Sequence, residues 1–321
     1  AAAFSVAEWT TKVQRPFIGV QLAFDGNTSP SYVARSGTPI RVDIAWINNL
    51  PVRVYDGEVT LQITGDTLDK NSVDVLRGFY QSQDDKIYWN KDTNSDFEFF
   101  GPGEQGDVNF TFNSYALTTT DQFRNPEIYI TLVAAGQRVE QQQVPELVKT
   151  TMTRTIKIAT DLLLSSRAVY STGPFQNRGP IPPKVGEETT YTVIWTVTNS
   201  SNDITNAKVE AKLPLYMKWI SVVSPDDADV SYNPIGGTVV WNVGNVPAGT
   251  GYSTTAKTVA FQVSFVPSVS QVLSEVEILL DQSLRGFDTF TRVFVGDNNR
   301  NLSTKLSTDP YVPSQHSQVV Q

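Results

Sequence analysis

Cysteine is absent from the 321 residues and histidine occurs once, which excludes several kinds of chemistry together. Without cysteine there is no disulfide framework and no thiolate metal site. The one histidine, His316, stands in a polar stretch near the C-terminus, so no Ser-His-Asp triad, histidine metal cluster or histidine general base is available. We therefore expect no enzymatic activity, and no cofactor beyond a calcium ion discussed below.

Charge and long apolar runs are also scarce. Charged residues make up 18% of the chain, and the formal net charge is -8. An acidic chain offers no basic patch for phosphates, so we expect no nucleic-acid partner. No apolar run approaches the roughly 18 residues that a membrane span requires, so no span is expected in this chain. Residues 1–3, all alanine, fit the remainder of a cleaved export signal, although a trimmed chain begins in the same way.

A long internal repeat dominates what is present. Four pairs of residues recur at offsets between 149 and 152 positions: Trp46 with Trp195, Val59 with Val209, Trp89 with Trp241, and Phe110 with Phe261. An offset that changes so little over this span indicates two tandem domains of about 150 residues each. The repeat predicts that Trp46 and Trp195 occupy equivalent places in the two domains.

The residues around both tryptophans alternate between apolar and polar. Val42, Ile44 and Trp46 alternate in the first copy, as Val193 and Trp195 do in the second, which is the period of a half-buried strand. Many such short segments, separated by Gly, Pro and Asp turn signals, favour antiparallel sandwiches. The fold class is therefore all-β, with two tandem Ig-like antiparallel β-sandwiches and extended terminal arms. The expected parts are an N-terminal arm (1–15), sandwich 1 (16–159), sandwich 2 (160–302) and a C-terminal tail (303–321).

The second half resembles an Ig-like cell-surface repeat of unknown function found in bacteria and archaea. The match is carried by residues 190–193, 196–203, 206–209, 213–214, 219–220, 237–244 and 247–249. Ser201 stands where the pattern has Gly, Lys212 stands where it has Asp, and the first half lacks the Leu-Pro of residues 213–214. Residues 179–186 also resemble surface proteins of candidate-phylum bacteria. The resemblance implies an Ig-like fold at the cell surface, outside the cell, and implies no activity.

One acidic segment spaces oxygen-bearing side chains at alternate positions, as calcium loops do. Its members are Asp92, Asn94, Asp96 and Glu98. Alternate residues of a tight loop converge their oxygens on a hard cation, so the spacing predicts a calcium site. However, Phe97 replaces the glycine that the sharp turn favours, so a plain acidic turn remains the alternative.

The N-terminal arm is apolar enough to bind a groove. Its apolar side chains are Phe4, Val6, Trp9 and Val13. An extended arm can complete a sheet edge through main-chain hydrogen bonds, so we expect it to pair with a second copy and produce a homopolymer. Docking of the arm on its own domain is the alternative.

The leading functional prediction is an extracellular structural subunit of a cell-surface fibre or surface layer. An adhesin that recognises a glycan or a protein through loops is the alternative, and so is a stalk within a larger surface protein. The tryptophans that repeat between the domains are expected in the cores, where each buries on the order of 200 Å², rather than in a sugar-binding platform.

Overall fold

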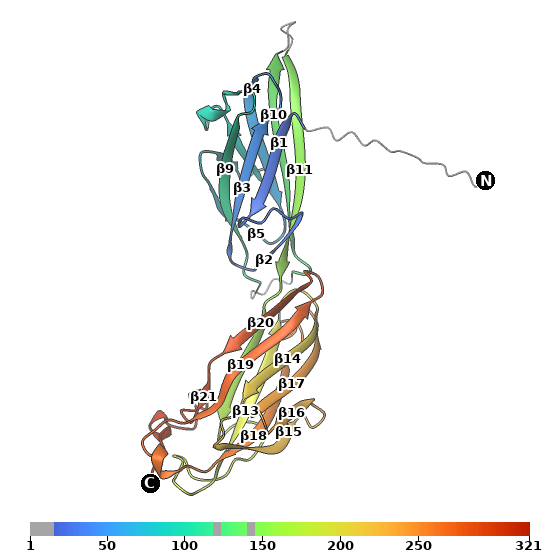
Figure 1. Cartoon of the computed structure of the whole chain (residues 1–321). Helices are drawn as coiled ribbons and strands as arrows, with labels where there is room; N and C mark the ends of the chain where they lie inside the picture. The colour runs from blue at the N-terminus through green and yellow to red at the C-terminus, as the bar shows by residue number, and fades with distance from the viewer. Residues whose placement is uncertain (1–15, 118–122, 140–144) are drawn as a thin grey trace, which may run out of the picture. The chain divides into compact units, whose positions relative to one another are not determined.

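The computed structural model describes residues 16–117, 123–139 and 145–321, and these fold into two compact units (Figure 1). Within the described ranges, unit 1 takes residues 16–34, 38–115 and 127–157, and unit 2 takes residues 35–37, 116–126 and 158–321. Each unit consists of two antiparallel sheets that enclose an apolar core.

Unit 1 contains the first eleven strands. They are β1 (Ile18–Phe24), β2 (Ser31–Arg35), β3 (Pro39–Asn48), β4 (Val54–Thr64), β5 (Leu68–Val75), β6 (Phe79–Gln81), β7 (Lys86–Asn90), β8 (Phe99–Phe100), β9 (Gln105–Ser114), β10 (Glu127–Val139) and β11 (Pro145–Ala159), with the 3-10 turn η1 (Ser95–Phe97). One sheet has the order β1-β3-β9-β5 and the other β2-β11-β10-β4-β7-β6, with β8 beside β4.

Unit 2 contains the remaining ten. They are β12 (Leu162–Val169), β13 (Thr189–Asn199), β14 (Ile204–Lys212), β15 (Met217–Ser224), β16 (Val230–Asn233), β17 (Thr238–Val246), β18 (Lys257–Phe265), β19 (Glu277–Asp288), β20 (Val293–Asn299) and β21 (Leu302–Ser303), with the turns η2 (Val269–Gln271) and η3 (Ser314–His316). The sheet orders are β12-β13-β18-β15 and β16-β17-β14-β19-β20, with β21 beside β19.

Both units follow one topology, and it is that of the Ig fold. In unit 2 the order β12-β13-β18-β15 corresponds to Ig strands A-B-E-D, and β20-β19-β14 corresponds to G-F-C. The hairpin β16–β17 extends the second sheet beyond strand C. In unit 1, β1-β3-β9-β5 and β11-β10-β4 take the same places, and β6–β7 is the added hairpin. The prediction of two tandem Ig-like β-sandwiches is confirmed.

Strand pairing confirms one of the tryptophan pairs as well. Trp89 on β7 lies opposite Val59 on β4, and Trp241 on β17 lies opposite Val209 on β14. Both indoles are buried. The pairing of β7 with β4 in unit 1 therefore recurs as the pairing of β17 with β14 in unit 2, with tryptophan opposite valine in both.

The register of the B and E strands is consistent with an offset of 151 on both. Phe110 on β9 lies opposite Val42 on β3, and Phe261 on β18 lies opposite Val193 on β13. Both the B-strand residue and the E-strand residue therefore shift by the same number of positions. The pairing of Phe110 with Phe261 agrees with this register.

The pairing of Trp46 with Trp195, at an offset of 149, differs by two residues from the offset of 151 at which these pairs and the buried residues Asn48 and Asn199 align. At an offset of 151, Trp46 takes the place of Val197, and Trp195 takes the place of Ile44. A shift of two keeps both side chains on the inward face, and both are buried. Trp46 fits near its strand end because Gly106 lies opposite, where any side chain would collide with the indole ring.

Two buried asparagines follow the same offset. Asn48 ends β3 and Asn199 ends β13, and neither is exposed. Each amide donates to carbonyl oxygens in the loop after its own strand and in the segment that precedes strand E. The asparagine is therefore the duplicated residue at the end of strand B.

The C-terminal tail does not form the extended arm that the sequence predicts. Leu306 and Val319 are buried in unit 2. Val319 forms a parallel bridge with Val272, and Val320 forms one with Lys184. Burial of the two apolar side chains, together with these main-chain bridges, favours a docked tail over a solvated one.

Candidate functional site

The predicted assembly arm, with Phe4, Val6, Trp9 and Val13, lies outside the described residues. Strand addition by the arm therefore stays a prediction. The described residues include sheet edges at which an added strand could pair.

Most edge strands are poorly suited to accept another strand. β5 and β15 carry irregular register, which bends an edge away from a partner. β6 and β16 have only three and four residues. The A strands β1 and β12 are longer, with seven and eight residues in regular register. Together with β20, an edge strand of seven residues in regular register, they are the edges best suited to strand addition.

The hydrogen bonds of Leu164 show which main-chain groups of β12 face outward. The Leu164 N–H donates to Asp297 Oδ2 at 3.0 Å, and Asn299 Nδ2 donates to the Leu164 carbonyl oxygen at 2.8 Å. Because main-chain groups alternate along a strand, the N–H and C=O of Ser166 and Ala168 also point away from β13.

A second attachment lies at the far end of β12. Asp309 Oδ2 accepts the N–H groups of Tyr170 at 2.7 Å and Ser171 at 2.6 Å. Between the two attachments, the outward main-chain groups of Ser166 and Ala168 have no partner among the residues that the structure describes. We call this stretch the open edge of β12.

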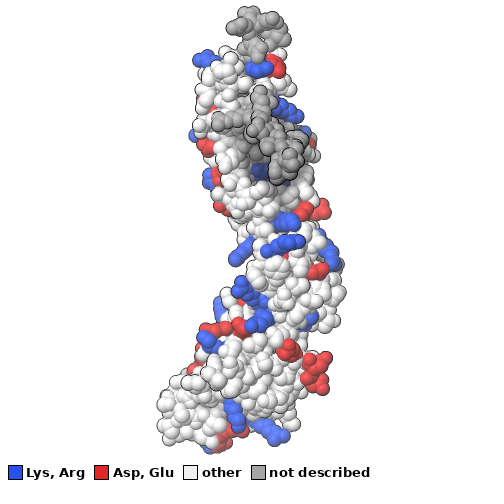
Figure 2. Space-filling model, turned by 45° about the vertical axis from the view of Figure 1, so that its right-hand side comes forward, with Lys and Arg blue, Asp and Glu red and all other residues white. Residues whose placement is uncertain are grey.

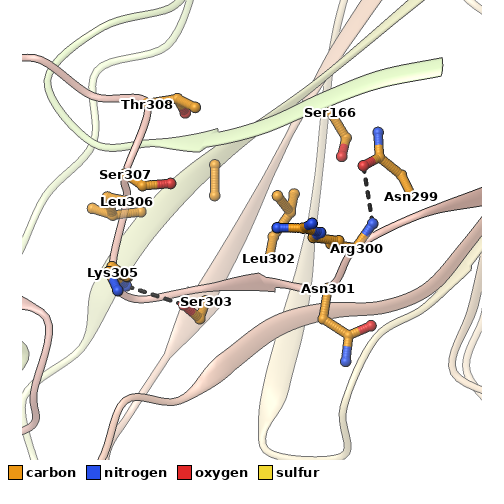
Figure 3. Close-up of a pocket in the computed structure, with 11 residues that line it drawn as sticks. Ser166, Asn299, Arg300, Asn301, Leu302, Ser303, Lys305, Leu306, Ser307 and Thr308 are labelled. Carbon is orange, nitrogen blue, oxygen red and sulfur yellow. Dashed lines mark hydrogen bonds between the residues drawn. The ribbon is translucent and has the colours of Figure 1, made fainter.

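The open edge lines a pocket of about 270 Å³ (Figure 3). Its other wall is the chain that leaves β20, and the lining residues are Ser166, Ala168, Asn299, Arg300, Asn301, Leu302, Ser303, Lys305, Leu306, Ser307 and Thr308. The Ser166 Oγ is buried and has no partner within the described ranges. The pocket therefore combines unused main-chain groups with an unused hydroxyl.

Local turns position the polar wall of the pocket that faces β12. The Arg300 N–H donates to Asn299 Oδ1 at 2.9 Å, and the Lys305 N–H donates to Ser303 Oγ at 3.3 Å (Figure 3). Neither the Arg300 nor the Lys305 side chain forms an ion pair with a described residue. The site is suited to a short extended peptide, which β12 would bind through its main chain.

Unit 1 offers a related opening on β1. Phe24 exchanges two main-chain hydrogen bonds with Asn27, both 2.8 Å, and Thr150 Oγ1 donates to the Ile18 carbonyl oxygen at 2.7 Å. By the same alternation, Val20 and Leu22 direct their main-chain groups outward.

The predicted calcium residues lie between β7 and β8, around η1. Asn94 caps η1, because its Oδ1 accepts the Asp96 N–H at 3.1 Å. The side chains of Asp92, Asp96 and Glu98 are exposed. Among the described residues, no group of three or more His, Cys, Asp or Glu side chains is placed to hold a metal. The cap accounts for Asn94 without a metal, and calcium binding stays a prediction.

If the loop binds calcium, added calcium raises the melting temperature, because a ligand held only by the folded state stabilises it. Asp92→Ala and Asp96→Ala should each abolish the rise. Asp226→Ala, in an exposed loop of unit 2, should leave it unchanged. Differential scanning calorimetry with and without calcium measures the effect, and an equal rise in all variants removes this loop as the site.

Charged side chains of both signs are interspersed on the face shown in Figure 2. No helix among residues 16–117, 123–139 and 145–321 is long and apolar enough to cross a membrane.

No protein-family model matches the chain, and neither does any curated protein. Solved structures of low similarity do match. The C-terminal domain of the AgI/II polypeptide BspA from Streptococcus agalactiae is 10% identical, with a TM-score of 0.33, over 89% of this chain and 99% of that chain. The C-terminal domain of the antigen I/II-family protein AspA from Streptococcus pyogenes has the same identity and TM-score, over 90% and 100%. BcpA, the major pilin subunit of Bacillus cereus, is 11% identical, with a TM-score of 0.31, over 85% and 59%.

Similarity at this level carries no argument about what the chain does. The Ig-like fold rests on the strand order of each unit. The resemblance of the second half to the envelope repeat, and to candidate-phylum surface proteins, stays a prediction.

Proposed function

We propose that the chain is an extracellular structural subunit of a cell-surface fibre or surface layer. The N-terminal arm of one copy adds a strand to the open edge of β12 in the next copy. The product is a homopolymer, and the proposal includes no catalytic step.

The open edge of β12 is the observation that carries the proposal. A main-chain N–H or C=O that remains unpaired in a partly enclosed site costs free energy, so Ser166 and Ala168 favour a partner that supplies hydrogen bonds. An extended peptide supplies both donors and acceptors at the spacing of a strand. The fixed attachments at Leu164 and Tyr170 define where such a peptide pairs.

The joint also explains how assembly would continue. A donor arm and an acceptor edge are different surfaces of the same chain, so the contact is heterologous. Heterologous contacts generate open filaments unless their rotation closes a ring. One type of joint is therefore sufficient for a fibre.

A glycan-binding adhesin is the second candidate function. Its support is a groove on the outer face of the second sheet of unit 2, described in the next subsection. Stalk and fibre roles are compatible with such a groove, because the groove and the pocket at the open edge of β12 share no lining residue.

Ala168→Pro tests whether the open edge of β12 is the edge that accepts the arm. Proline removes the outward N–H of this residue, while the main-chain bonds to β13 use other residues. Edge strands tolerate proline, so the variant should stay folded. We expect monomers at a concentration where the native chain forms polymers, measured by light scattering, with melting curves as the check on folding.

Val20→Pro, at the opening on β1, is the matched control and should assemble normally. If a folded Ala168→Pro chain polymerises like the native one, β12 is not the acceptor. If Val20→Pro alone prevents assembly, β1 is the acceptor instead.

A further inference from the structure

A polar groove of about 680 Å³ lies on the outer face of β14, β19 and β20 in unit 2. The three strands are neighbours in one sheet, as Figure 1 shows. The groove shares no lining residue with the pocket at the open edge of β12, and the outward side chains of Lys208, Ser283, Arg285, Phe294 and Asn298 take no part in that edge.

Two cations face each other at the centre of the groove. Lys208 on β14 lies directly opposite Arg285 on β19, and both side chains are exposed. Like charges directly opposite each other on neighbouring strands destabilise a sheet. Gly296 on β20 lies opposite Arg285 on the other side, so no side chain fills that position. The centre of the groove is therefore cationic and hollow.

The two cations have different partners. Lys208 Nζ forms an ion pair with Glu210 Oε1 on its own strand. The Arg285 guanidinium lies 4.2 Å from the centre of the Phe294 ring, and it forms no ion pair with any residue that the structure describes. Stacking on the ring orients the guanidinium, which leaves its N–H groups available for a planar anion such as a carboxylate.

The cross-strand residue pairs on either side of the cations supply neutral hydrogen-bonding groups and an aromatic surface. On one side, Ser283 pairs with Asn298 across β19 and β20. On the other side, Phe287 pairs with Phe294, whose ring is 60% exposed. Hydroxyl and amide groups bind sugar hydroxyls, and an exposed aromatic ring contacts the C–H groups of a sugar.

We propose that this groove binds a carboxylate-bearing sugar, such as a uronic acid unit of a surface glycan. The sugar carboxylate pairs with Arg285 and Lys208 over the hollow at Gly296. The sugar hydroxyls meet Ser283 and Asn298, and the ring C–H groups meet the edge of Phe294.

A peptide is the less suitable occupant of this surface. β14 and β19 are each paired on both sides, so their main-chain groups are already used by the sheet. An acidic peptide would bind through its side chains alone and leave its own main-chain groups without partners. A sugar presents polar groups around its whole ring and has no such deficit.

The test is calorimetric titration of the full chain with glucuronic acid and, separately, with glucose. We expect glucuronic acid to bind with a Kd of about 1 mM and glucose at least tenfold more weakly, because only the acid brings a carboxylate to the Arg285 guanidinium. Added salt should weaken binding of the acid, since the contact is exposed and electrostatic.

Arg285→Gln should weaken glucuronic acid binding about tenfold, the loss expected when an ionic contact of roughly 1.4 kcal/mol is removed. Lys212→Gln is the matched control. Lys212 lies on the same face of β14, outside the groove, and pairs with Asp281 at 3.0 Å. We expect it to leave binding unchanged.

Three results overturn the proposal. The first is glucose binding as tightly as glucuronic acid, and the second is Lys212→Gln reducing binding as much as Arg285→Gln does. A glutamate-containing tripeptide that binds more tightly than glucuronic acid would identify an acidic-peptide site instead. None of these outcomes depends on whether the chain polymerises.

Discussion

Replacing Trp195 by alanine lowers the free energy of unfolding of unit 2 by about 3–5 kcal/mol, the range for emptying a large core site. The indole is 0% exposed and packs edge-on against Phe261, with ring centroids 4.9 Å apart. Its Nε1–H donates to Gln282 Oε1 at 2.8 Å inside the core. The substitution therefore creates a cavity and also leaves a buried acceptor without its donor.

Denaturant melts that resolve the two units measure this loss, because a two-unit chain need not unfold in a single step. Trp219→Ala is the control, since Trp219 is only partly buried against the same core and should cost less. A loss below about 1 kcal/mol for Trp195→Ala contradicts a core position.

Replacing Asn199 by alanine should cost about 3 kcal/mol. Its Nδ2 donates to the carbonyl oxygens of Asn202 at 2.7 Å, Val246 at 2.9 Å and Pro247 at 3.1 Å. Its Oδ1 accepts from Thr160 Oγ1 at 2.7 Å. Each buried group left unpaired costs about 1–3 kcal/mol, and partial rehydration recovers some of that sum.

The same melts test Asn199, with Asn242→Ala as the control. Asn242 is an exposed strand residue whose amide meets only Asp229, so its loss should stay within about 0.5 kcal/mol. Equal effects of the two substitutions would show that the buried asparagine does not join strand B to its neighbouring loops.

The strand order could be predicted in outline because alternation and the repeat offset are local properties of the chain. The residue-by-residue alignment of the two domains was harder to predict. Identical tryptophans suggested an alignment at 149, but Trp46 depends on the space left by Gly106, a residue far away in the sequence. Asn48 and Asn199 are the reliable markers, since their hydrogen bonds fix both at the strand end.

The open edge of β12 could not be predicted from its own residues. Its limits are set by Asp297 and Asp309, which lie more than a hundred positions later and belong to polar segments without periodicity. The docked tail was missed for a related reason, because Leu306 and Val319 are isolated apolar residues in a polar sequence. Pairing with distant segments, rather than local pattern, determines both features.

Strand addition by the arm is tested most directly by the mass of a chain that lacks residues 1–12. Light scattering of the native and shortened chains at the same concentration gives that mass, with melting curves to show that both are folded. We predict polymers for the native chain and folded monomers for the shortened one. A shortened chain that still polymerises would contradict the account, because the arm would then not be the joint.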